Sequence, residues 1–219
     1  MKRLDLVVGC DGAGKSTFIE LTLAPLLARS LYVNADEIAR RRWPDDPAGH
    51  SYEAARIAAA THAQLIALGE SFIAETVFSH PSKLELLDAA RAAHYTVILH
   101  VVLIPEELAV LRVRQRVKAG GHHVPESKIR QRYQRLWDLV ATAASRADEA
   151  TFYDNSAIHG PRIVAQLAAG ITLGSPRGRP GLRPPRSPAV GHDRHGPDRT
   201  RVASRRRDPV TRRSGCERL

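Results

Sequence analysis

Short apolar runs alternate with segments of helical periodicity along most of the chain. Apolar runs of about four to eight residues suit buried strands, whereas a repeat of about 3.6 residues suits one face of a helix. The sequence therefore predicts a parallel sheet with helices on both faces, a three-layer α/β/α domain. The predicted strands are 4–8, 31–33, 71–77, 95–104 and 150–153, and the predicted helices are 15–29, a short one capped by Asn34, 51–68, 81–93, two that begin at 105 and 125, and 163–169.

The connection between the first strand and the first helix, residues 9–17, reads Gly-Cys-Asp-Gly-Ala-Gly-Lys-Ser-Thr. This spacing is typical of the phosphate-binding loop of P-loop NTPases, here with a nucleotide-kinase-like order of elements. Glycines let backbone N–H groups turn toward phosphate, and the helix N-terminus adds positive potential. We predict Lys15 on the β- and γ-phosphates and the Ser16 hydroxyl on Mg²⁺. The predicted nucleotide-binding residues are Gly9, Asp11, Gly12, Ala13, Gly14, Lys15, Ser16 and Thr17.

Three polar side chains stand at the ends of neighbouring predicted strands. Because ligands of parallel sheets bind outside the carboxyl ends of the strands, we expect Asp36, Glu75 and Thr76 beside the phosphate loop, in contact with substrate. Asp36 is a candidate general base for an acceptor hydroxyl, and Thr76 is a candidate hydrogen-bonding partner of the acceptor. Glu75 is a candidate ligand of Mg²⁺ through water. The alternatives are a stabilising helix-terminal acid for Asp36 and a buried, paired carboxylate for Glu75.

Arginines flank a predicted flexible turn at residues 118–124. Arg116 precedes the glycine pair of this turn, and Arg130 and Arg132 follow it. A glycine hinge between arginines suits a segment that closes over a triphosphate, so Arg116 and Arg132 are candidate catalytic cations. Solvated helix charges are the alternative. Arg130 and Arg132 border opposite edges of one apolar helix face, so we do not expect both to reach the same phosphate.

The last part of the chain, residues 174–219, has a different composition. Proline, arginine, glycine and serine dominate it, and it carries nearly all of the chain's net charge of +10. We expect it to be disordered, because it lacks the apolar side chains that offset the entropy of folding. The basic isoelectric point belongs to this tail, so it does not indicate a nucleic-acid partner for the domain at residues 1–173.

Cysteine usage and apolar runs predict where the protein resides. The two cysteines, Cys10 and Cys216, form neither a disulfide framework nor a metal-binding cluster. The N-terminus has no signal-peptide pattern, and no apolar run approaches the roughly 20 residues of a membrane span. We expect a cytoplasmic protein without a membrane partner.

Several phrases together resemble the zeta-toxin family of P-loop kinases over about residues 3–170. They are NADEIA, SFIAETVFS, RVKAGGHHVPESKIRQRY and TFYDNS. The resemblance implies a kinase that uses ATP or GTP with Mg²⁺ and phosphorylates a hydroxyl of a UDP-N-acetylsugar such as UDP-N-acetylglucosamine. It also implies an antitoxin protein as a partner. Carried over to this chain, the catalytic residues are Lys15, Asp36, Arg116 and Arg132, and Thr76 contacts the acceptor.

The third predicted strand departs from the family pattern. Its end reads Ala74-Glu75-Thr76 where the reference toxins have Glu-Gly-Thr, and a shift of one residue turns a side chain to the other face of a strand. Three alternatives therefore stay open: a P-loop kinase for another small hydroxyl acceptor, a polynucleotide 5′-hydroxyl kinase, and a nucleotide-dependent switch or ATPase without an acceptor.

Overall fold

The computed structural model describes residues 2–121 and 124–173. The predicted tail at residues 174–219 lies outside the described residues, as do His122 and His123 of the predicted turn. Within the described part of the chain, no helix combines the length and the apolar character that a membrane crossing requires.

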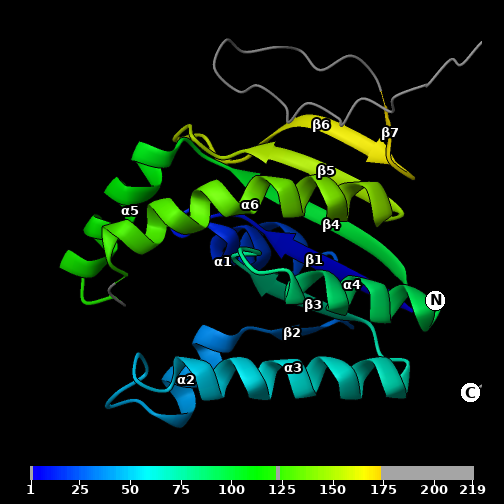
Figure 1. Ribbon diagram of the computed structural model, residues 1–219, viewed down its shortest axis with the longest axis horizontal. Coiled ribbons are helices and arrows are strands. Elements are labelled where there is room, and N and C mark those ends of the chain that lie inside the picture. The colour runs from blue at the N-terminus through cyan, green and yellow to red at the C-terminus, as the bar shows by residue number, and fades with distance from the viewer. Residues whose placement is uncertain (1, 122–123, 174–219) are drawn as a thin grey trace, which may run out of the picture. The chain divides into compact units, whose positions relative to one another are not determined.

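The described residues form one sheet with the strand order β2-β3-β1-β4-β5-β6-β7 (Figure 1). Strands β2, β3, β1, β4 and β5 run parallel, and β6 and β7 are antiparallel to their neighbours. The predicted sheet is thus confirmed over its first five strands. The strands are β1 (Arg3–Val8), β2 (Leu31–Val33), β3 (Phe72–Thr76), β4 (Thr96–Leu103), β5 (Glu149–Asp154), β6 (Arg162–Ala168) and β7 (Ile171–Thr172).

Helices cover both faces of this sheet, which confirms the three-layer α/β/α architecture. Figure 1 shows α4 and α6 in front of the sheet and α1 behind it, and α3 contacts both α4 and β2. The predicted helix at 51–68 is confirmed residue for residue as α3. Gly69, in the left-handed conformation that commonly ends a helix, follows its last residue. The helices are α1 (Lys15–Phe18), the π-helix η1 (Ile19–Leu23), α2 (Ala35–Arg42), α3 (Ser51–Leu68), α4 (Ser82–Ala92), α5 (Glu106–Lys118) and α6 (Glu126–Arg146).

The predicted final helix at residues 163–169 is wrong, because this segment forms strand β6. β6 pairs in antiparallel fashion with β5, which would otherwise leave its outer backbone groups unpaired at the sheet edge. Two glycines with positive φ, Gly160 and Gly170, allow turns on either side. A seven-residue segment gains little as an isolated helix, so the hydrogen bonds of the edge decide its structure.

The first helical segment, α1 with η1, ends at Leu23 and is therefore shorter than the predicted helix at residues 15–29. α1 passes directly into η1, where the Ala24 N–H donates to the Ile19 carbonyl at 2.8 Å, a bond across five residues. Pro25 follows, and a proline has no backbone N–H with which to continue the helix. The chain then turns toward β2.

A buried ionic network lies within the sheet. Asp5 on β1 is fully buried, and its two carboxylate oxygens accept hydrogen bonds from Arg3 at 2.6 Å each. His100 Nε2 on β4 lies 2.8 Å from Asp5 Oδ1, and its Nδ1 lies 3.3 Å from the Tyr153 hydroxyl. Burial alone would raise the pKa of Asp5, but the hydrogen bonds from His100 and Arg3 outweigh burial and lower it. Phe18 packs against His100 and Tyr153, so the start of the first helix rests on this network.

At His62 on α3, in contrast to Asp5, burial determines the direction of the pKa shift. Its ring stacks on Phe72 of β3, and its Nε2 atom is buried without a hydrogen-bond partner among the described residues. Burial, with a smaller contribution from the charge of Lys83, lowers the pKa of His62 to about 4. The folded state therefore holds this imidazole neutral at pH values where the unfolded chain protonates it.

We expect this histidine to make the protein less stable as the pH falls from 6.5 toward 4. In that interval the unfolded chain binds a proton at His62 and the folded chain does not, which costs about 1–2 kcal/mol at pH 5. Thermal unfolding at pH 7 and pH 5 should show a smaller loss for His62→Phe than for the wild type. His159→Gln, which removes an exposed histidine, is the matched control. An unchanged loss in His62→Phe would contradict the prediction.

Candidate active site

The phosphate loop leaves the carboxyl end of β1 and enters α1 with its glycines in special conformations. Gly12 and Gly14 have φ of 77° and 84°, values that favour glycine, and Gly14 is the N-cap of α1. Gly9 allows a close approach, because a Cβ there would lie 2.5 Å from the Val102 carbonyl oxygen of β4. Ala13 is buried, and Thr17 is exposed on α1.

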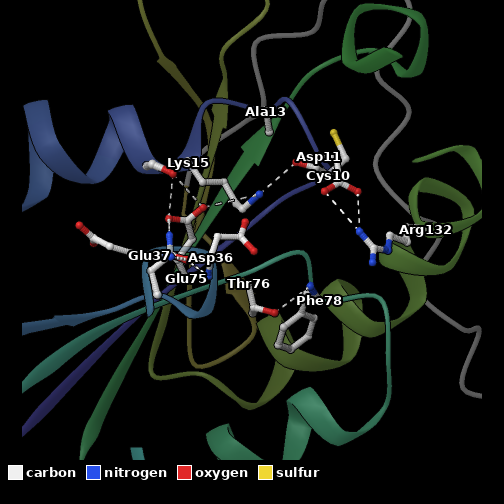
Figure 2. A network of polar contacts seen from close by, with 12 residues as sticks. Cys10, Asp11, Ala13, Lys15, Asp36, Glu37, Glu75, Thr76, Phe78 and Arg132 are labelled. Atoms are coloured by element: carbon white, nitrogen blue, oxygen red, sulfur yellow. Dashed lines mark hydrogen bonds and ion pairs between the residues drawn. The ribbon is translucent and has the colours of Figure 1, made fainter. Parts of the chain in front are cut away.

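Lys15 is buried at the start of α1. Its ammonium donates to the Cys10 carbonyl at 3.1 Å and lies 3.9 Å from Glu75 Oε1 (Figure 2). The lysine therefore folds back over the loop, where backbone N–H groups and a cation together suit phosphate. Cys10 itself is buried, which raises the pKa of its thiol to about 11, so this cysteine stays protonated and is not a nucleophile.

Glu75, at the end of β3, points toward the phosphate loop despite its shifted position in the sequence. The Ser16 hydroxyl donates to both of its carboxylate oxygens, at 3.2 and 3.0 Å. The Tyr32 hydroxyl and the Asn34 amide, which donates at 2.7 Å, also hold Glu75 Oε2. The carboxylate is thus nearly buried, with 10% of the side chain exposed, and is surrounded by donors. The shift by one residue does not turn it away from the phosphate loop.

Asp36 and Thr76 lie at the same edge of the sheet. Asp36 is exposed in the first turn of α2, whose N-terminus Asn34 caps, and the predicted cap is confirmed. In Figure 2 the Asp36 carboxylate points to the side of Lys15 and Thr76, whereas that of Glu37 points away. The Thr76 hydroxyl accepts a hydrogen bond from the Phe78 N–H at 3.3 Å. The register of β1 with β3 pairs Val8 with Thr76, so the end of β3 lies beside the start of the phosphate loop.

The candidate arginines differ in their surroundings. Arg132 on α6 reaches the phosphate loop, where its guanidinium pairs with Asp11 at 3.1 Å. Arg116 is exposed near the end of α5, where its side-chain stem lies close to Gly121. Arg130 instead pairs with three glutamates, Glu106, Glu107 and Glu126, which tie α5 to α6. Arg130 and Arg132 thus have different carboxylate partners, and only Arg132 contacts a residue of the phosphate loop.

Asn155, which we did not predict, holds the phosphate loop from the side opposite Glu75. It follows β5, and its side-chain amide donates to the Ala13 carbonyl at 2.8 Å. Its own carbonyl accepts a hydrogen bond from Arg112 of α5 at 3.0 Å. A Cβ on Gly14 would lie 2.7 Å from the Asn155 amide nitrogen, so the glycine also makes room for this contact. The available signal was an amide directly after a strand that ends at the ligand edge of the sheet.

The oxygen atoms at this edge suit a hard cation. The Ser16 hydroxyl and the Glu75 carboxylate lie 3.0 Å apart and face each other beside Lys15. Hydroxyl and carboxylate oxygens are the groups that Mg²⁺ uses together with phosphate oxygens. These residues therefore fit a magnesium–triphosphate complex.

The family model described as Zeta toxin matches residues 1–158. The chain belongs to the zeta toxin family. Among curated proteins, it is similar to an uncharacterized protein of Haemophilus influenzae, with 28% identity over 126 residues that cover 57% of this chain and 88% of the relative. Family membership and the fold agree with the P-loop class that the phosphate loop indicates.

Solved structures with low sequence identity to this chain have the same fold. A chain of the AvrRxo1-ORF1:AvrRxo1-ORF2 structure with sulphate ions aligns with a TM-score of 0.62 and 16% identity, over 79% of this zeta toxin family member and 60% of that chain. A chain of the PezAT toxin-antitoxin system of Streptococcus pneumoniae aligns with a TM-score of 0.57 and 14% identity, over 77% and 75%. This family member thus spans about 60% of the AvrRxo1 chain.

We predict that Asn155→Ala weakens both the fold and nucleotide binding. The substitution leaves the Ala13 carbonyl without its donor, which costs about 1–3 kcal/mol, and it releases the loop that must hold its N–H groups toward phosphate. Urea unfolding and ATP titration of the full chain measure the two effects. Ser156→Ala is the matched control, because Ser156 bonds to Asp154 and not to the loop. Equal ATP affinity in Asn155→Ala and the control would contradict the prediction.

Proposed function

We propose that this zeta toxin family member is a Mg²⁺-dependent kinase that transfers the γ-phosphoryl group of ATP, or of GTP, to a hydroxyl of a UDP-N-acetylsugar. The observation that carries the proposal is the contact between Glu75 and Ser16, which joins the end of β3 to the phosphate loop. A phosphate loop alone indicates only a nucleotide. A second carboxylate, that of Asp36, extends the site toward an acceptor.

The loop side of the site binds the nucleotide. Lys15 contacts the β- and γ-phosphates in place of its present partner, the Cys10 carbonyl. Ser16 and Glu75 would hold Mg²⁺, and the bound cation would neutralise charge on the phosphates. Arg132, already paired with Asp11 of the loop, adds positive charge beside the transferred group.

The acceptor side contains the general base. The acceptor hydroxyl oxygen attacks the γ-phosphorus, the bond from that phosphorus to the bridging oxygen breaks, and ADP leaves with the bond's electron pair. Asp36 receives the hydroxyl proton. Its carboxylate suits this role because it is exposed and forms no hydrogen bond or ion pair within residues 2–121 and 124–173. Thr76 contacts the acceptor from the neighbouring strand end.

Family membership supports the choice of a UDP-N-acetylsugar as the acceptor. ATP as the donor is consistent with a similar AvrRxo1-ORF1:-ORF2 structure that contains ATP. That pair and the PezAT system each consist of two components, which supports an antitoxin protein as a partner of this chain. Another small hydroxyl compound and a polynucleotide 5′-hydroxyl are the alternative acceptors.

The acceptor is tested with the full chain, Mg²⁺ and ATP, offered UDP-sugars, free sugars, nucleosides and 5′-hydroxyl RNA in separate reactions. We expect mass spectrometry to find a phosphate added to a UDP-N-acetylsugar and none with Lys15→Ala, which lacks the phosphate-binding ammonium. A phosphorylated product in another reaction would replace the acceptor. ATP binding without any product would contradict the assignment as a kinase for these acceptors, and normal activity in Lys15→Ala would contradict the site.

We predict that Asp36→Asn lowers turnover by about 10²-fold or more and changes ATP affinity only slightly. The amide keeps the size of the side chain but cannot accept the acceptor's proton, and a lost general base has an effect of this size. Steady-state rates with the phosphorylated acceptor measure it. Glu37→Gln is the matched control, since this neighbouring carboxylate points away and pairs with Arg41. Asp36→Asn with a rate within tenfold of the control would show that Asp36 is not the base.

A further inference from the structure

The side chain of Asn34 connects two parts of the site. Its oxygen accepts hydrogen bonds from the N–H groups of Asp36, at 2.7 Å, and Glu37, at 3.3 Å, and so caps α2. Its nitrogen donates to Glu75 at 2.7 Å and to the Tyr32 hydroxyl at 2.8 Å. Backbone donors on one side and a carboxylate on the other leave a single orientation of the amide that satisfies all four partners.

Tyr32 completes this arrangement from strand β2. Its hydroxyl accepts the hydrogen bond from Asn34 and donates its own proton to Glu75 Oε2. A tyrosine hydroxyl is protonated at neutral pH and can therefore donate this hydrogen bond. Glu75 Oε2 therefore has two neutral donors on β2 and its connection, and these donors have no other role in the proposed reaction.

These two donors matter because the third donor, Ser16, is needed elsewhere. In the ligand-free chain the Ser16 hydroxyl points its proton to Glu75. If that hydroxyl oxygen bound a divalent cation, its contact with Glu75 would change, and Tyr32 and Asn34 would be the remaining hydrogen-bond donors to the carboxylate, beside the more distant ammonium of Lys15. Without Tyr32 and Asn34, only the Lys15 ammonium, 3.9 Å away, would orient Glu75, and Lys15 is expected to bind phosphate instead.

We propose that Tyr32 and Asn34 are positioning residues that hold Glu75 for a magnesium–triphosphate complex, and that Asn34 couples this carboxylate to the helix that carries Asp36. The inference rests on the proposed function, because it assumes that Glu75 and Ser16 bind the cation of a nucleoside triphosphate. On this inference, part of the gain in nucleotide affinity that Mg²⁺ provides depends on the Asn34 amide and the Tyr32 hydroxyl, which hold Glu75 in place.

The test measures ATP affinity of the full chain by calorimetry, once with excess Mg²⁺ and once with EDTA. The variants are Tyr32→Phe, which removes one hydroxyl, and Asn34→Ser, which keeps a good helix cap but loses the donor to Glu75. We expect the ratio of the two affinities to fall about tenfold in each variant, the usual effect of removing a partner of a metal ligand. The affinity in EDTA should stay within about twofold of the wild type.

Tyr95→Phe is the matched control for lost stability. The Tyr95 hydroxyl donates to the carbonyl oxygens of Leu65 and Glu70, at 2.9 Å each, in contacts that include no phosphate-loop residue. This variant should lower the unfolding temperature and keep the wild-type affinity ratio. A wild-type ratio in both Tyr32→Phe and Asn34→Ser would overturn the inference, even with lowered stability. A wild-type chain that binds no ATP would instead contradict the proposed function.

Discussion

The site depends on a carboxylate that is held between the end of one strand and the phosphate loop. A nearly buried carboxylate such as that of Glu75 is costly unless hydrogen-bond donors surround it. Its donors come from three different segments: Ser16 on α1, Tyr32 on β2 and Asn34 at the start of α2. Each donor gains a partner only if β2, β3 and the loop keep their places. The cost of the buried charge therefore becomes a constraint on how these segments are arranged.

The opposite side of the loop is held in a different way. There the contact is between neutral groups, the Asn155 amide and the Ala13 carbonyl, and it depends on the pairing of β4 with β5. The ionic network around Asp5 and His100 joins β1 to β4, and Phe18 of α1 packs against its histidine. A loop anchored on two sides has its backbone N–H groups arranged before any nucleotide arrives, which reduces the entropy lost on binding.

The sequence predicted the parallel strands well, because buried strands require apolar runs that few other structures tolerate. It failed where the outcome depends on distant partners. Residues 163–169 form a strand because β5 offers an open edge, which the segment's own pattern does not reveal. The orientation of Glu75 was equally hidden. The shift relative to the family order suggested that Glu75 lies on the other face of the strand. The register of β2 and β3 pairs Tyr32 with Ile73, two residues before Glu75, and the Tyr32 hydroxyl reaches the Glu75 carboxylate.

The arginines show how far a helical pattern extends and where it stops. Residues 130 and 132 lie about 200° apart around a helix, so they were expected to face different neighbours. Which of them faces the phosphate loop follows from the charges opposite each one. Three glutamates neutralise Arg130, whereas Arg132 meets a single aspartate within the phosphate loop. A carboxylate in that loop would repel a triphosphate, and the cation from α6 offsets this repulsion. In the proposed kinase, helix α6 contributes to the nucleotide site through this one ion pair, because the positive charge of Arg132 offsets the negative charge of Asp11.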